Sequence, residues 1–278
     1  MSGALFAFSA TAVAVRALAR SFSVFEILAF RNVAGIAILL AAALLNPKLR
    51  PHLRPRRMGL HAVRNAAHFG ATYAWTLGVT LLPLATVFAL EFTSPAWVAL
   101  LAVLLLGEDL TVGRIVAVVF GFAGVLVIVR PGLGTLQPAS FIVLASAFGF
   151  AATAIATKIL TRTESVFAIL FWMSTMQLVP NFAGSGHAFW LKAEGQHALP
   201  LAAIGIGGLL SHYCLTNAYR IADASMVMPL DFLRIPLIAV VGWWLYAERL
   251  DPLVLLGSGL IVTGILFNLR AEARTARP

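Results

Sequence analysis

The chain has 278 residues, of which 60% are hydrophobic and only 11% are charged. A soluble domain carries about 25% charged residues, so this composition excludes a soluble globular protein and favours an integral membrane protein. The net charge of +9 does not indicate nucleic-acid binding, because the basic residues lie in short loops between apolar runs. We therefore expect a lipid bilayer, and no nucleic acid, among the partners of this protein.

Ten apolar runs follow one another along the chain, each suited to cross a hydrocarbon core of about 30 Å as a helix. Short loops with helix breakers, such as Asn46–Pro47 and Asp251–Pro252, separate them. The sequence therefore predicts an all-α integral membrane protein with ten transmembrane helices. Its first run begins almost at Met1, which suggests a first helix shortened by a few residues. The expected spans are Ser2–Leu18, Val24–Leu45, Met58–Leu81, Leu84–Leu106, Thr111–Val129, Pro138–Leu160, Val166–Gly184, Leu199–Tyr219, Ala222–Tyr246 and Pro252–Leu269.

The two halves of the chain repeat each other at a nearly fixed offset. The segment Ala10–Leu18 reappears as Ala152–Leu160, and Leu90–Glu91–Phe92 aligns with Leu230–Asp231–Phe232. Five spans per half is an odd number, so the second half enters the membrane from the opposite side. We expect two inverted five-helix repeats, residues 1–132 and 133–278, the second ending in a short basic tail. Duplicated membrane halves are typical of secondary transporters, whose substrate site lies between the repeats.

The distribution of Lys and Arg predicts the orientation of the chain in the membrane. With both termini in the cytoplasm, thirteen of these residues lie on the inner side, Arg64 among them, and five lie on the outer side. Since cytoplasmic loops carry the excess of positive charge, we expect a multi-pass protein of the inner (plasma) membrane with both termini cytoplasmic.

Several short segments in the predicted spans carry a family resemblance. They are Phe25–Glu26, Phe30–Arg31, Ala89–Pro95, Leu106–Gly107–Glu108, Gly121–Val125 and Ala222–Asp223–Ala224. On these segments the chain resembles, over its whole length, the drug/metabolite transporter superfamily and within it the EamA family of ten-helix carriers. It departs from the pattern at Ala247–Glu248, where the family has Gly–Glu, and in the residues before the first helix. Within the family, the chain is similar to carriers for S-adenosylmethionine and riboflavin.

Four charged residues lie in the middle of the predicted spans: Arg31, Glu91, Asp231 and Arg234. Each such charge costs about 2.5–3.5 kcal/mol on insertion scales, so it persists where it faces the protein interior or a wet cavity. Asp231 and Arg234 are three residues apart and share a helix face, so we expect them to pair. Glu91 has no basic residue at that spacing, and we expect Arg31 to be its partner.

These charges predict a cavity between the halves, lined by the third, fourth, eighth and ninth spans. Its arginines would hold anionic groups of a substrate and its carboxylates cationic groups, while Glu91 or Asp231 could take up a coupling proton. The alternative is a set of internal salt bridges that lock the halves together. His68 and His212 fall at comparable depth and are further candidates for proton coupling; the alternative is that they are hydrogen-bonded within the bundle.

Aromatic residues near these charges add candidates for substrate binding. Tyr73 and Tyr213 are repeat-mates, and Trp97 and Asn217 lie close to them or to Glu91 in the sequence. An aromatic-lined cavity suits a planar or cationic metabolite, although aromatic residues in membrane helices also serve as packing or interface anchors. The candidate substrate-binding residues are Arg31, Tyr73, Glu91, Trp97, Tyr213, Asn217, Asp231 and Arg234.

Motifs for other chemistries are absent from the sequence. The single cysteine, Cys214, excludes an intramolecular disulfide and a cysteine-based metal cluster. The chain has no His-Glu-x-x-His zinc motif, no phosphate-binding G-x-x-x-x-G-K-[ST] loop and no G-x-S-x-G nucleophile motif. We therefore expect no metal, no cofactor and no enzymatic activity.

The sequence predicts a secondary transporter of a small polar or amphipathic metabolite that works by alternating access between the two repeats. A polytopic membrane enzyme acting on lipid-linked substrates is one alternative, and it would need catalytic groups clustered at a membrane face. An accessory membrane subunit is another. A homodimer is compatible with the small-residue faces Gly121–Gly124 and Gly257–Gly264, which suit packing within a chain as well as between chains.

Overall fold

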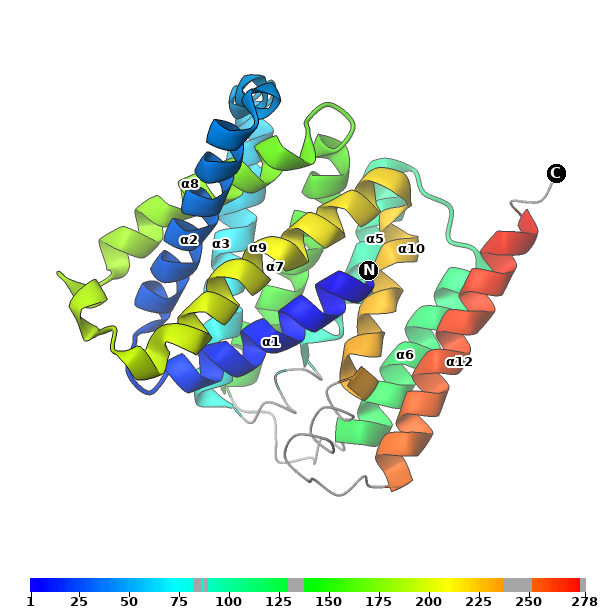
Figure 1. The fold of residues 1–278 in the computed structure, drawn as a ribbon. Coiled ribbons are helices and arrows are strands. Elements are labelled where there is room, and N and C mark those ends of the chain that lie inside the picture. The colour runs from blue at the N-terminus through cyan, green and yellow to red at the C-terminus, as the bar shows by residue number, and fades with distance from the viewer. Residues whose placement is uncertain (83–86, 88–89, 130–137, 238–251, 276–278) are drawn as a thin grey trace.

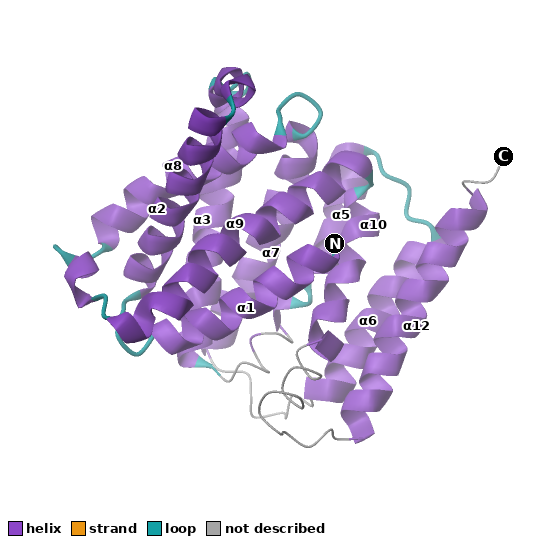
Figure 2. Cartoon of the chain, in the orientation of Figure 1, coloured by secondary structure: helices purple, strands orange, loops and turns teal. Residues whose placement is uncertain are grey.

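A computed structural model describes residues 1–82, 87, 90–129, 138–237 and 252–275, and the described residues form helices and no strands (Figures 1 and 2). Four short 3₁₀ turns lie between or next to the α-helices: η1 (Pro47–Leu53), η2 (Phe189–Lys192), η3 (Gly195–His197) and η4 (Met228–Leu233). The α-helices are α1 (Ser2–Leu18), α2 (Val24–Leu45), α3 (Met58–Leu81), α5 (Ser94–Leu106), α6 (Val112–Val129), α7 (Pro138–Leu160), α8 (Val166–Gly184), α9 (Ala198–Ile221), α10 (Ala224–Val227) and α12 (Pro252–Thr275).

The described helices have the length and composition of membrane spans. Five helical segments are long and apolar enough to cross a bilayer: α2, α7, α8, residues Gly195–Ile221 and residues Pro252–Ala271. α1, α5 and part of α6 are shorter apolar helices. The expected all-helical membrane protein is therefore confirmed. α12 continues past its predicted end at Leu269 to Thr275, because Ala, Glu and Arg in this stretch favour the helix even where it is polar.

The second helix of each half begins with the same local signal. Ser23 accepts a hydrogen bond from the backbone N–H of Glu26, whose carboxylate accepts in return from the backbone of Ser23, which forms a capping box at the start of α2. Ser165 caps α8 through a single hydrogen bond, which its side chain accepts from the backbone N–H of Ala168. Lys192 of η2 also donates to Glu26 at 2.8 Å, so the start of α2 is tied to the segment that follows α8.

The main helix packings each join one helix of the first half to one of the second. α1 packs on α9, α3 on α7, α2 on α8 and α6 on α12, and the α6–α12 pair lies at one edge of the bundle (Figure 1). A Cβ atom at Gly124 would lie 2.5 Å from the carbonyl oxygen of Gly257, so glycine permits the close approach of α6 and α12. The prediction that these small-residue faces form close helix–helix contacts is confirmed.

The fourth and ninth predicted spans are interrupted rather than continuous. Phe92 and Thr93 form a turn before α5 begins at Ser94, and the four-residue α10 passes into the 3₁₀ turn η4. Proline is tolerated in the first turn of a helix but not in its interior, and Pro95 and Pro229 each lie where a helical segment restarts.

The sequence predicts one transmembrane span over each of these segments, with Pro95 and Pro229 as kink positions, and the structure divides each span into shorter helical pieces. The two interruptions fall at matching positions of the two halves and carry Glu91 and Asp231. The predicted start of the fourth span at Leu84, the end of the ninth at Tyr246 and the repeat boundary at residues 132 and 133 lie outside the described residues.

Candidate functional site

A buried charge cluster lies where the two interrupted spans meet. The Arg234 guanidinium is 2.8 Å from a carboxylate oxygen of Glu91 and 2.6 Å from one of Asp231. The indole N–H of Trp75 donates to the other oxygen of Glu91 at 2.6 Å. The expected Asp231–Arg234 pair is confirmed. The expected Arg31–Glu91 pair was wrong, because the two helix interruptions bring both carboxylates, one from each half, to the same arginine.

Aromatic rings surround the guanidinium of this cluster. The Arg234 Cζ atom lies 5.5 Å from the ring centroid of Phe8 and 5.2 Å from that of Phe92. Phe92 in turn stacks on its repeat-mate Phe232, with ring centroids 5.4 Å apart. The rings hold the guanidinium plane through cation–π contacts and limit the access of water, so the ion pairs act in a medium of low polarity.

A cavity of about 130 Å³ adjoins the charge cluster. It has room for several water molecules or for part of a metabolite. Both halves of the chain contribute to its wall. The polar and aromatic lining residues include Phe8, Thr11, Arg31, Arg64, His68, Thr72, Trp75, Glu91 and Phe92 from the first half, and Phe150, Thr157, Ser211, His212, Thr216, Tyr219, Asp231 and Arg234 from the second.

The cavity brings together six of the residues that were proposed from the sequence: Arg31, His68, Glu91, His212, Asp231 and Arg234. The described residues of its wall belong to α1, α2, α3, α5, α7, α9 and the two interrupted segments. The expected third, fourth, eighth and ninth spans are therefore present in the wall, and the first, second and sixth spans contribute as well.

The other four candidates do not line this cavity. Tyr73 packs on the ring of Phe25 at 4.7 Å, and Trp97 is 39% exposed. Tyr213 is 52% exposed, and Asn217 donates to the Tyr213 carbonyl one helical turn away. Tyr213 directly follows the cavity residue His212, and adjacent helix residues point about 100° apart, which turns the tyrosine outward. The structure places these four side chains as packing or surface residues.

A hydrogen-bonded network behind the wall holds two of its polar side chains. Gln177 of α8 lies 2.9 Å from His68 Nδ1 and accepts a hydrogen bond from Arg31 at 3.3 Å. The rings of His68 and His212 face each other edge to face, with centroids 4.8 Å apart. The two histidines therefore belong to the bundle's polar interior and line the cavity at the same time.

Sequence reasoning missed Arg64, which was assigned to the cytoplasmic loops. The structure buries Arg64 in α3, only 1% exposed, where it donates to Thr157 of α7 at 3.1 Å. A signal was available, because Arg64, His68, Thr72 and Trp75 recur at helical spacing and form one polar stripe in an apolar helix. Without Arg64 the inner side still holds twelve basic residues against five, so the predicted orientation is unaffected.

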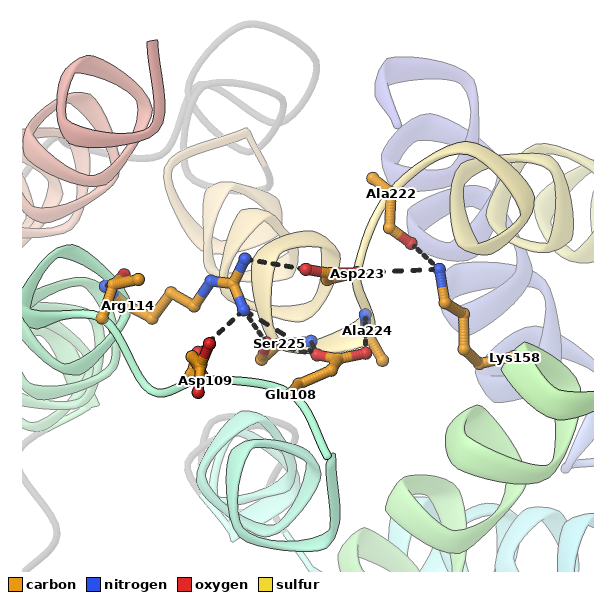
Figure 3. Close-up of polar contacts among 9 residues, drawn as sticks. Glu108, Asp109, Arg114, Lys158, Ala222, Asp223, Ala224 and Ser225 are labelled. Atoms are coloured by element: carbon orange, nitrogen blue, oxygen red, sulfur yellow. Dashed lines mark hydrogen bonds and ion pairs between the residues drawn. The ribbon is translucent and has the colours of Figure 1, made fainter. Parts of the chain in front are cut away.

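A second cluster of polar contacts ties the α5–α6 loop to the start of α10 (Figure 3). Glu108 accepts hydrogen bonds from the backbone N–H groups of Ala224 at 3.0 Å and Ser225 at 3.1 Å. Arg114 binds Asp223 at 2.9 Å and the Ser225 hydroxyl at 2.8 Å. This cluster joins the two halves on the face that the charge distribution predicts to be cytoplasmic.

The chain is similar over most of its length to known membrane transporters. A family model described as the EamA-like transporter family matches residues 1–130 and again residues 137–270. The chain is 32% identical over 253 residues to a riboflavin transporter of Brucella anthropi, covering 87% of each chain. It is 26% identical over 250 residues to an S-adenosylmethionine uptake transporter of Rickettsia felis, covering 90% of this chain and 84% of that one.

Two further matches complete the comparison. A riboflavin transporter of Rhizobium johnstonii is 34% identical over 206 residues, covering 73% of this chain and 68% of that one. A crystal structure of another protein aligns over 99% of both chains with a TM-score of 0.76 and 18% identity. At that identity, the structural match establishes a shared fold and nothing further.

Proposed function

Because the chain belongs to the EamA-like transporter family, it is a membrane transporter rather than an enzyme, and we propose that it carries a small polar or amphipathic metabolite by alternating access. The observation that carries the proposal is the Glu91–Arg234–Asp231 cluster. Its charges come from both halves of the chain, at interrupted helices, beside a cavity with walls from both halves. Transporters built from two repeats place their substrate sites at such broken helices.

The proposed architecture is two inverted five-helix repeats, residues 1–132 and 133–278. The helix contacts support it. If α1 takes the place of α7 and α3 takes the place of α9, and the reverse, the observed α1–α9 contact becomes the α3–α7 contact, which is also observed. The α2–α8 and α6–α12 pairs are each preserved by the same exchange. An exchange of this kind is what a two-fold axis between the repeats would produce.

In the proposed cycle, the two repeats rock about the cavity and open it to one side of the membrane at a time. The Glu108–Arg114–Asp223 contacts would hold the cytoplasmic side closed and would separate when that side opens. The bacterial inner membrane, with both termini in the cytoplasm, is the proposed location.

The named relatives suggest the first substrates to test. Riboflavin and S-adenosylmethionine both carry a planar heteroaromatic ring, and Trp75, Phe92 and Phe150 line the cavity wall. Aromatic walls of this kind favour planar rings through stacking.

The proposal is tested by metabolite profiling of cells and medium. The comparison is between the intact chain and an Asp231→Asn variant at equal membrane abundance, with Asp109→Asn in the exposed α5–α6 loop as the matched control. A solute should move between cells and medium with the intact chain and the control, and not with Asp231→Asn. If supplied riboflavin, S-adenosylmethionine and all profiled solutes are distributed alike in every strain, the transport proposal fails.

A further inference from the structure

Two arginines of the cavity wall are held by neutral partners. Arg31 donates to the side-chain oxygen of Gln177 at 3.3 Å. Arg64 donates to the hydroxyl of Thr157 at 3.1 Å and to the amide oxygen of Asn65 at 2.8 Å. In the described part of the chain, neither guanidinium has a carboxylate within 4.0 Å. A guanidinium has five N–H donors, so these contacts leave most donors of both residues for a ligand or water.

The acids of the cavity do not balance these two charges. Glu91 and Asp231 both bind Arg234, so this cluster carries one net negative charge. Arg31 and Arg64 add two positive charges, so an excess of one positive charge remains among the described residues of the wall. Both guanidinium groups line the same cavity as His68. Uncompensated charge at membrane depth is costly, and a bound anion would offset that cost.

The protein fixes the position of Arg31 across the boundary between the halves. A Cβ atom at Gly208 of α9 would lie 2.9 Å from Arg31 Cδ, so the arginine stem rests directly on the glycine backbone. Arg64 is held across the same boundary by Thr157 of α7. Two guanidinium groups fixed in this way present forked donors that match the oxygens of a carboxylate or phosphate.

We infer that Arg31 and Arg64 bind an anionic group, a carboxylate or a phosphate, of the transported metabolite. The inference rests on the proposed transport function and names the class of its substrate. The anionic group lies at Arg31 and Arg64, and the planar ring lies toward Trp75 and Glu91, which line the same cavity.

Matched pairs of probes test the inference by equilibrium binding to the full chain in lipid nanodiscs. One pair is S-adenosylmethionine and its decarboxylated form, which differ by the carboxylate. The other is flavin mononucleotide and riboflavin, which differ by the phosphate. In at least one pair, the anionic member should bind about tenfold to a hundredfold more tightly, as expected for charge-assisted hydrogen bonds. The pair that responds distinguishes a carboxylate site from a phosphate site.

Variants assign the preference to the two arginines. Arg31→Gln and Arg64→Gln should each remove most of the preference for the anionic probe, whereas Arg31→Lys and Arg64→Lys should keep part of it, because lysine retains the charge without the fork. The control Arg162→Gln changes an exposed residue of the α7–α8 loop and should leave the preference unchanged. The lysine variants carry the test if a glutamine variant does not fold.

Three results would overturn the inference: equal binding within both pairs, no binding of either anionic probe, or an unchanged preference in the variants. If the Arg31→Gln and Arg64→Gln variants transport neutral riboflavin at unchanged rates, the proposed anion site is rejected and the transport function is retained. Movement of no solute in the profiling experiment would remove the transport function itself, so the two failures are distinguishable.

Discussion

Arg234 holds the two repeat-related acids together. One guanidinium binds both Glu91 and Asp231. The removal of Arg234 would therefore leave two unpaired carboxylates in the interior, at a cost of about 3–5 kcal/mol, whereas the removal of one acid leaves the other paired with Arg234. The indole N–H of Trp75 donates a hydrogen bond to Glu91, which is the second partner of this carboxylate. Protonation of one carboxylate would neutralise it and weaken its hold on Arg234, which gives the cluster a way to respond to protons.

We propose that a carboxylate of this cluster takes up the proton that drives transport. In proteoliposomes, a pH gradient should accelerate transport of the profiled solute by the intact chain. The Glu91→Gln, Asp231→Asn double variant should move no solute beyond passive leak, with or without the gradient, since neither side chain can bind and release a proton at neutral pH. Asp109→Asn serves as control. Persistence of the acceleration in the double variant contradicts proton coupling through this cluster.

Some residues of the site can be predicted from the sequence and others cannot. The cost of charge in a membrane identifies Arg31, Glu91, Asp231 and Arg234 from position alone, and all four line the cavity. The partner of Glu91 could not be predicted, because Arg234 lies 143 residues away and reaches it through the packing of the halves.

The direction in which each side chain points from its helix limits such predictions further. Arg64 lies near the predicted start of the third span, where a basic residue usually belongs to a loop, yet its side chain points inward. Tyr213 matches Tyr73 in the repeat, but neither lies in the cavity wall.

At the scale of elements, the interrupted helices decide where the charges lie. A continuous helix would carry its polar side chains on a stripe, whereas the turns at Phe92–Thr93 and η4 place Glu91 and Asp231 where helical segments meet. Hydropathy predicts the bounds of α1, α2, α3, α7 and α8 because lipid contact requires an apolar run of fixed length. It does not predict the interruptions, since these segments are as apolar as the unbroken ones. Pro95 and Pro229 were the available signal.

The Glu108 cluster makes a prediction about local stability at the cytoplasmic face. Glu108 accepts from the first N–H groups of α10, and losing such a cap typically costs about 1 kcal/mol. Glu108→Ala should therefore raise the hydrogen–deuterium exchange rate of a peptide covering residues 222–227 about fivefold. Asp109→Ala is the matched control, because Arg114 contacts only the backbone carbonyl of Asp109. Equal exchange in both variants would mean that Glu108 does not hold this contact closed.

At the scale of the whole molecule, each main helix contact joins the two halves. A motion that opens one side must therefore slide or tilt α1 on α9 and α3 on α7, while the polar clusters make and break. The cavity wall is shared in the same way, so a rocking motion changes which side of the membrane it faces. These relations between the halves support the proposed alternating-access cycle.

Two-sided access to that cavity is the measurement that tests this account most directly. In a Cys214→Ala background, Thr11→Cys places one thiol at the cavity wall. A membrane-impermeant thiol reagent is applied to right-side-out and to inside-out vesicles, with Arg162→Cys in the α7–α8 loop as the control that reacts from one face. Alternating access predicts that the Thr11→Cys thiol reacts from both faces, and more slowly when a transported solute is present. Reaction from a single face, unaffected by any solute, would contradict it.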